Sequence, residues 1–323
     1  MSRSDVALIP HYQTNLSMRI RLLGTAAGGG VPQWNCNCVI CQLARAGTGR
    51  VRARTQSSVA ISADGSHWFL LNASPDIRTQ IEATSALHPS PGTTRGSRVK
   101  AVLLTNADLD HTLGLFLLRE GEPLSVHATS QVQHALTEAL TLTPTLHAFC
   151  GLRWVEPSKK LAPLMLPNGS PSGLLYQGIP LTGHPPRFAR KGALPGTGYV
   201  IGYKFVDETS GGRLLFLPDV AEMDEGLLRW LPDCDVLLFD GTFWSENEME
   251  QRGVGAASAS AMGHVPISEP NGSLNALAKL TVKHKLYVHI NNTNPILDEQ
   301  SAERATVTKA GCLVGMDGME LEI

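Results

Sequence analysis

The residues best suited to chemistry lie in a short polar loop in the first half of the chain. The segment VLLTNADLDHTLGLFLLRE, residues 102–120, runs from an apolar, strand-like stretch through this loop into an apolar, helix-like stretch. Asp108, Asp110 and His111 lie at the junction, and α/β proteins concentrate their chemistry in loops at the carboxyl ends of strands. Carboxylates beside an imidazole predict a metal site, although Asn106 and Asp108 occupy positions where a familiar hydrolytic motif has histidines.

Three later strand-like segments also end in a carboxylate or an imidazole. They are RLLFLPD, which ends at Asp219, DVLLFDGT, which contains Asp240, and KLYVHINNTNP, which contains His289. His184, in the loop LTGHPPRF, is a further candidate. A single Asp after a strand is more often a turn former or a helix cap. Because several strand ends can converge on one edge of a sheet, their recurrence predicts a shared metal site.

Three cysteines, Cys36, Cys38 and Cys41, crowd into the segment CNCVIC. Thiolates at this spacing can wrap one tetrahedral zinc ion, which would stabilise loops rather than catalyse. The alternative is a set of free or buried thiols. A zinc ion would need a fourth ligand from elsewhere in the chain, and the candidates are Cys150, Cys234, Cys312 and His264.

The elements that must position these residues are short strands and helices. Strand-like runs recur at 19–23, 58–62, 68–72, 99–104, 214–217, 236–239 and 286–290. Helix-like segments lie between them, at 113–119, 130–140, 223–230 and 274–282. This pattern predicts an α/β layered domain with mixed sheets rather than a simple alternation.

Composition narrows the class of protein. The 323 residues are 42% hydrophobic and 17% charged, with a net charge of −2, so no basic excess favours nucleic-acid binding. We expect no membrane insertion, since no apolar run reaches the length of a bilayer span. Residues 1–17 lack the apolar core of a signal peptide. We therefore predict a cytoplasmic protein, with 1–17 as an extension that is disordered or left over from cloning and 18–323 as one domain.

Several blocks together resemble one family, the pyrroloquinoline quinone (PQQ) biosynthesis protein B family, PqqB. They are LLGTAAGGGVPQWNCNCVICQLARAG, RTQSSVAIS, NASPDIRTQI, DHTLGLFLLREGEPLSVH, DGTFWSENEMEQRGVG and HINNTNPILDEQSAER. The resemblance extends over 18–323. It implies a metallo-β-lactamase αββα sandwich, in which two mixed β-sheets are flanked by helices and metal binds at one edge.

The resemblance also implies ligand sets. The superfamily's His-x-His-x-Asp-His loop matches Asn106, Asp108, Asp110 and His111, and its later metal positions match His184, Asp219 and His289. We therefore expect the active-site metal on Asp110, His111, Asp219 and His289. A zinc site of similar phosphodiesterases matches Cys36, Cys38, Cys41 and His264.

Loss of two histidines from the motif points away from hydrolysis. Hydrolases of this fold use two ions, and Asn106 and Asp108 remove two imidazoles from one half-site. The remaining ligands suit non-haem Fe(II), although Zn and Mn are also accepted. The resemblance implies Fe(II)- and O2-dependent hydroxylation of the tyrosine ring in a Glu-Tyr precursor derived from the PQQ precursor peptide. His184 and Asp108 would complete the coordination or act as acid and base.

Substrate contacts are predicted from charge and aromaticity. Arginine binds carboxylates in a forked geometry, so the candidates are Arg54, Asp76, Arg78, Arg187, Trp244 and Arg252. For each arginine an ordinary ion pair is at least as frequent a role, and a Trp in a motif more often lies in the core. Other PQQ biosynthesis proteins and a second copy of the chain are candidate partners.

Two alternative functions remain open. A non-catalytic carrier that assists transport of PQQ or its precursor would bind tightly without turnover. A zinc phosphodiesterase-like hydrolase would hold two metals at the sheet edge, and the loss of the leading histidines disfavours it.

Overall fold

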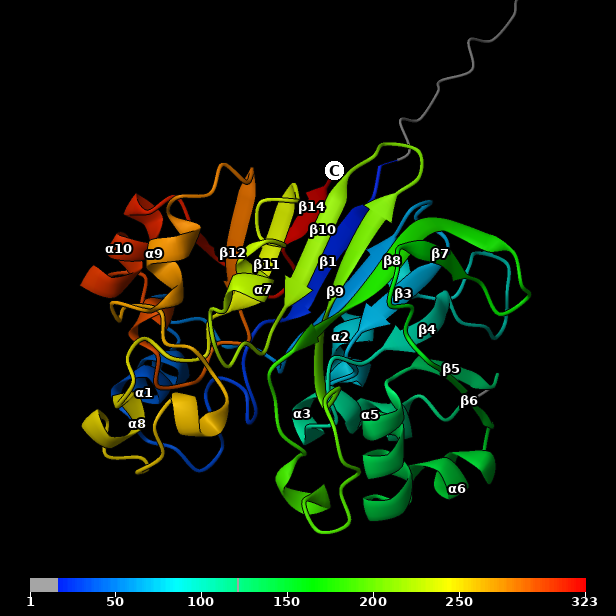
Figure 1. Cartoon of the computed structure of the whole chain (residues 1–323), viewed down its shortest axis with the longest axis horizontal. Coiled ribbons are helices and arrows are strands. Elements are labelled where there is room, and N and C mark those ends of the chain that lie inside the picture. Colours follow the sequence, from blue (N-terminus) through cyan, green and yellow to red (C-terminus); the bar gives the residue numbers. More distant parts are fainter. Residues whose placement is uncertain (1–16, 121) are drawn as a thin grey trace, which may run out of the picture.

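Two seven-stranded sheets face each other across an apolar layer (Figure 1). The computed structural model describes residues 17–120 and 122–323, so all but Ser17 of the expected N-terminal extension lies outside the described residues. Helices cover the outer faces of both sheets, which is the αββα sandwich expected from the sequence.

The first sheet has the strand order β14-β1-β2-β3-β4-β5-β6. Its strands are β1 (Arg19–Gly24), β2 (Ser58–Ser62), β3 (Trp68–Leu71), β4 (Val99–Leu103), β5 (Leu124–His127), β6 (Leu152–Val155) and β14 (Glu320–Glu322). The strands β14, β1, β2 and β3 pair antiparallel, whereas β3, β4, β5 and β6 pair parallel.

The second sheet has the order β13-β12-β11-β10-β9-β8-β7. Its strands are β7 (Ala162–Met165), β8 (Pro171–Leu181), β9 (Val200–Asp207), β10 (Arg213–Leu217), β11 (Val236–Asp240), β12 (His284–Val288) and β13 (Leu313–Val314). An antiparallel meander, β7 to β10, continues into the parallel strands β10 to β13. The carboxyl ends of β10, β11 and β12 therefore meet at one edge.

The strands are apolar because most of them are covered on both faces. In β3, Phe69 and Leu71 point into the layer between the sheets, while Trp68 and Leu70 pack under the outer helices. All five residues of β11 are buried for the same reason. A continuous apolar run, rather than an alternating one, is the sequence pattern that this burial produces.

The helices are short. They are α1 (Val39–Ala46), α2 (Ile77–Glu82), α3 (Leu109–Thr112), α4 (Gly114–Leu117), α5 (Ser130–His134), α6 (Leu142–His147), α7 (Glu225–Leu228), α8 (Glu248–Gln251), α9 (Ser273–Leu277) and α10 (Ala302–Lys309), and a π-helical segment, Ala135–Ala139, continues α5. In Figure 1, α1, α9 and α10 lie on one side and α5 and α6 on the other. Gly114 allows α4 to approach the loop after β3, because a Cβ there would lie 2.3 Å from the Ser74 carbonyl oxygen.

The expected fold class is confirmed, and all seven expected strands are present with small shifts at their ends. Of the expected helices, 113–119 shortens to α4, 223–230 to α7 and 274–282 to α9, whereas 130–140 is formed by α5 and the π-helical segment that continues it. Strands β5 to β9, β13 and β14 were not expected. Half-exposed strands such as β7 and β8 do not present a simple apolar run. Within the described residues, no helix combines the length and apolar character needed to cross a membrane.

Candidate metal centre

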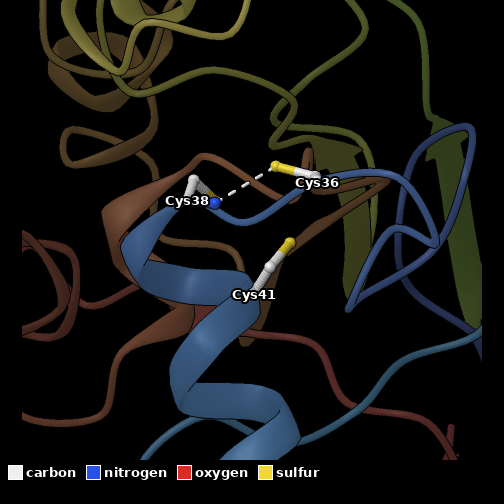
Figure 2. A group of neighbouring side chains, drawn as sticks. All are labelled: Cys36, Cys38 and Cys41. Atoms are coloured by element: carbon white, nitrogen blue, oxygen red, sulfur yellow. Dashed lines mark hydrogen bonds between the residues drawn. The ribbon is translucent and has the colours of Figure 1, made fainter.

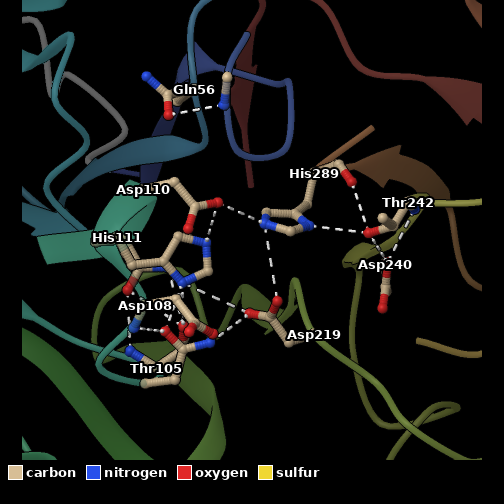
Figure 3. A network of polar contacts seen from close by, with 12 residues as sticks. Gln56, Thr105, Asp108, Asp110, His111, Asp219, Asp240, Thr242 and His289 are labelled. Atoms are coloured by element: carbon tan, nitrogen blue, oxygen red, sulfur yellow. Dashed lines mark hydrogen bonds and ion pairs between the residues drawn. The ribbon is translucent and has the colours of Figure 1, made fainter. Parts of the chain in front are cut away.

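Side chains from both sheets converge at one edge of the sandwich (Figure 3). Asp110 and His111 lie on α3, directly after the loop that follows β4. Asp219 follows β10 and His289 follows β12. The structure thus brings together the four residues expected to hold the active-site metal.

The distances within this cluster suit ligands of a single ion. The Nε2 atom of His289 lies 3.2 Å from Asp110 Oδ2 and 3.7 Å from Asp219 Oδ1. The Nε2 atom of His111 lies 3.8 Å from Asp110 Oδ2. Two groups of candidate ligands both contain His289, and within each group all ligand atoms lie within 4.8 Å of one another. The first group is Asp110, His111 and His289, and the second is Asp219, His264 and His289.

The imidazole of His111 is aimed at the cluster by its surroundings. Its Nδ1 donates to Asn106 Oδ1 at 2.9 Å, so the proton on the ring lies on that side. Its Nε2 is buried and has no hydrogen-bond partner among the described residues. A buried ring nitrogen without a partner is costly unless it binds a ligand, so this atom fits a metal ion.

His289 is oriented by the loop after β11. Its Nδ1 donates to Thr242 Oγ1 at 2.9 Å, and that hydroxyl contacts Asp240 Oδ1 at 2.6 Å. His289 itself adopts a positive φ of 54°. This strained backbone and the anchored Nδ1 leave Nε2 directed at Asp110 and Asp219.

His264 joins the same centre. Its Nδ1 lies 2.7 Å from Asp240 Oδ2, and its ring stacks at 5.5 Å on that of His289. The sequence placed His264 with the cysteines, and the structure corrects this: its ligand atom groups with Asp219 and His289 instead. Spacing alone did not distinguish the two sites, because both are assembled from residues distant in sequence.

The charges of the centre favour a cation. Burial opposes ionisation of Asp110, but the imidazoles of His111 and His289 outweigh it and hold the pKa of Asp110 well below its usual range. Burial alone would lower the pKa of His289, but the carboxylates of Asp219, Asp110 and Asp240 raise this pKa to about 10. In the metal-free protein a proton on His289 thus neutralises part of the negative charge, which a divalent ion would replace.

Asp108 immediately precedes α3, and His184 lies on the loop after β8. Atoms packed around the Asp108 carboxyl, together with the nearby charges of Asp110 and Asp219, raise its pKa to about 6, although the residue as a whole is exposed. His184 is exposed on the loop after β8. Neither belongs to a group of candidate ligand atoms in the described chain.

The thiols of Cys36, Cys38 and Cys41 converge at the start of α1, as expected (Figure 2). Burial raises the pKa of Cys38 to about 11, whereas hydrogen bonds from Cys38, Cys41 and Asn292 outweigh the burial of Cys36 and lower its pKa. The Asn292 amide nitrogen lies 3.3 Å from Cys41 Sγ, and Cys38 Sγ lies 3.6 Å from the Asn292 carbonyl oxygen. Asn292, rather than His264, is the side chain brought to the thiols.

The predicted substrate residues do not gather in one place. Arg54 is buried and donates to Thr25 and the Gly315 carbonyl oxygen, so it is a structural residue. The carboxylate of Asp76 accepts two hydrogen bonds from Gln56, at 2.9 and 3.0 Å. Others are dispersed: Arg78 and Arg187 are exposed, Trp244 packs against the core, and Arg252 lines a cavity of about 440 Å³ beside Cys36 and Cys38.

Sequence reasoning named Asp240 and Asn106 but not their role in orienting the ligands, and it missed Thr242. Thr242 and Asp240 hold two imidazoles, and Asn106 holds a third. The segment FDGT placed Thr242 two residues after Asp240, and HINN placed Asn292 three residues after His289. These spacings were visible, but which side chain each would contact depended on how the loops pack.

Comparison with known proteins identifies the family. Residues 67–290 match the Beta-lactamase superfamily domain. Coenzyme PQQ synthesis protein B of Pseudomonas putida (strain GB-1) is 42% identical over 309 residues, which is 95% of this chain and 100% of that protein. This chain belongs to the PqqB family. The resemblance found in the sequence is thereby confirmed.

Other PqqB relatives agree. The protein of Pseudomonas aeruginosa (strain UCBPP-PA14) is 43% identical over 307 residues, 95% of this chain and 100% of that protein. The crystal structure of Zn²⁺-bound PqqB from Methylobacterium extorquens has a TM-score of 0.84 at 39% identity and covers 94% of this chain and 100% of that one. A diphosphatase of the PhnP family shares the fold, with a TM-score of 0.63 at 19% identity. That match covers 95% of this chain and 97% of the diphosphatase chain.

Proposed function

We propose that this chain acts in PQQ synthesis as a metal-dependent hydroxylase of the tyrosine ring in a Glu-Tyr precursor derived from the PQQ precursor peptide. Its relatives are coenzyme PQQ synthesis proteins. The observation that carries the proposal is the ligand set, which retains Asp110, His111, Asp219 and His289 and lacks imidazoles at 106 and 108. Such a set with open positions favours Fe(II) and oxygen chemistry over two-ion hydrolysis.

The residues of the centre have distinct roles in this proposal. Asp110, His111, Asp219 and His289 would hold Fe(II), with His264 as a further imidazole; Zn or Mn could occupy the same donors. Bound Fe(II) would supply the activation of O2. Burial of the three imidazoles keeps bulk water from the inner side of the site.

Two residues outside the ligand groups are candidates for proton transfer, Asp108 and His184. Ring hydroxylation replaces a C–H bond with C–OH, so a nearby base assists by taking the proton that leaves the ring carbon. Asp108, with its pKa raised to about 6, suits this role near neutrality. His184 is the second candidate, as the motif match implies, and it lies on the exposed loop after β8.

The test is the mass of a Glu-Tyr peptide after incubation with Fe(II)-loaded protein, O2 and a reductant. One oxygen atom of O2 enters the ring, and the other leaves as water with two electrons from the reductant. We expect one added oxygen on tyrosine, which is lost in His289→Ala and kept in His147→Ala, whose exposed side chain lies at the end of α6. An unmodified peptide with iron bound and peptide binding retained would favour the carrier function instead.

We further propose that Cys36, Cys38 and Cys41 hold a structural zinc ion. Three convergent thiols are the soft donor set that zinc prefers. The side-chain amide of Asn292 contacts Cys41, its backbone carbonyl oxygen contacts Cys38, and Asn292 lies on the same loop as His289. This zinc ion would therefore brace the loop that carries an active-site ligand.

A further inference from the structure

Asn106 occupies a central place in the metal centre without being free to bind metal. It is buried, and its Oδ1 accepts from the His111 ring at 2.9 Å and from the Asp108 backbone N–H at 3.0 Å. A carbonyl oxygen has two acceptor sites, so both are engaged. The amide therefore has no lone pair left for an ion.

The other end of the Asn106 amide controls Asp219. Its Nδ2 donates to Asp219 Oδ2 at 3.1 Å, while Asp219 Oδ1 faces His289 Nε2 at 3.7 Å. A carboxylate that bridges two ions through its two oxygens, with the ions about 3.5–4 Å apart as in two-metal sites, offers one oxygen to each ion. Here one oxygen is directed to the ligand cluster and the other is held by an amide N–H.

We propose that Asn106 is the positioning residue that restricts this centre to one ion, by holding His111 with its carbonyl oxygen and one oxygen of Asp219 with its amide nitrogen. The same amide does both tasks at once. It keeps His111 Nε2 directed at the ion, and it withdraws Asp219 Oδ2 from a second one. The nearly isosteric Asp side chain could not do this, because a carboxylate has no N–H to donate to Asp219.

Asn106→Asp is therefore the sharpest variant. It keeps an acceptor for the His111 ring but places a second carboxylate against Asp219 Oδ2, and the repulsion between them is relieved by a cation. Together with Asp108, the new carboxylate provides oxygen donors for a second ion. Asn106→Leu is the companion variant, since it removes all three side-chain hydrogen bonds and adds no charge.

The experiment uses protein from which a chelator has removed all zinc except the ion on the three thiols, counts the Mn²⁺ that this protein binds, and records its electron paramagnetic resonance spectrum. Mn²⁺ prefers oxygen and nitrogen donors, so it does not displace zinc from the thiols. We expect one Mn²⁺ per chain in the wild type and two in Asn106→Asp, with the spectrum of an exchange-coupled pair. Asn106→Leu should bind one Mn²⁺ with an affinity lowered about 10- to 100-fold, because His111 and Asp219 lose their orienting partner.

Two coupled ions in the wild type would overturn the inference, as would a single ion in Asn106→Asp at any affinity. Unchanged affinity in Asn106→Leu would remove the positioning role. The inference rests on the proposed function only for the place of the metal. One ion without hydroxylation would defeat the proposed function alone, and two ions with hydroxylation would defeat this inference alone.

Discussion

The hydroxyl of Thr242 supports two imidazoles of the metal centre through a single atom. It accepts from His289 Nδ1 at 2.9 Å and contacts Asp240 Oδ1 at 2.6 Å, while Asp240 Oδ2 holds His264 Nδ1 at 2.7 Å. Thr242→Val preserves the shape of the side chain and removes that hydroxyl. We predict that this substitution weakens metal binding without changing any ligand.

The magnitude follows from what is left without a partner. His289 and Asp240 are both buried, with exposed fractions of 4% and 0%, so water cannot replace the lost hydroxyl. A buried polar group without a partner destabilises by about 1–3 kcal/mol. Loss of the group behind a metal-binding histidine typically lowers metal affinity about 10- to 100-fold, which corresponds to about 1.4–2.8 kcal/mol.

The assay is competition for Mn²⁺ between a chelator and protein that retains zinc only on the three thiols, at constant pH. The matched control is Thr137→Val, which removes a hydroxyl bonded at 2.7 Å to Thr143 outside the ligand groups. We expect the dissociation constant to rise 10- to 100-fold in Thr242→Val and to stay unchanged in Thr137→Val. Wild-type affinity in Thr242→Val would show that Thr242 does not orient His289.

Three further predictions concern stability, zinc and the predicted substrate residues. Burial raises the pKa of Glu248 from 4.5 in the unfolded chain to about 7 in the folded protein. The unfolded state therefore loses this proton first, and the free energy of unfolding falls by up to ~3 kcal/mol as the pH rises through this window. Urea titrations at several pH values should show a weaker pH dependence in Glu248→Gln, and an unaltered pH dependence would refute the assignment. Cys41→Ser should remove one zinc ion per chain by elemental analysis and lower the melting temperature, with Cys150→Ser as the control that keeps zinc. Arg54→Met should destabilise the fold by about 1–3 kcal/mol without altering metal affinity, and a selective loss of peptide binding would restore its expected substrate role.

The sequence alone determined the fold class and most of the centre. Buried strands read as continuous apolar runs because both faces are covered, so β3 and β11 were predictable. The Asp110–His111 pair and His289 follow such strands directly. Their closeness in sequence to a predicted strand was enough to place these ligands near a strand end.

Only the tertiary structure decided which distant residues share a site. The sequence argument assigns His264 to the cysteine site, and packing of its loop against β11 sets it beside Asp240 and His289 instead of the thiols. Asn292 takes the place at the thiols because the His289 loop crosses the start of α1. The directions in which these side chains point depend on loop packing, which no residue type or spacing encodes locally.

Burial likewise decided the role of individual charges. Arg54 has the residue type of a carboxylate-binding side chain, but the fold encloses it with Thr25 and the Gly315 carbonyl oxygen. Asn106 has the residue type of a lost ligand, but its amide engages His111 and Asp219. Residue type determined what each group can donate or accept, and the three-dimensional arrangement determined which partner it meets, because hydrogen bonding requires approach within about 3 Å.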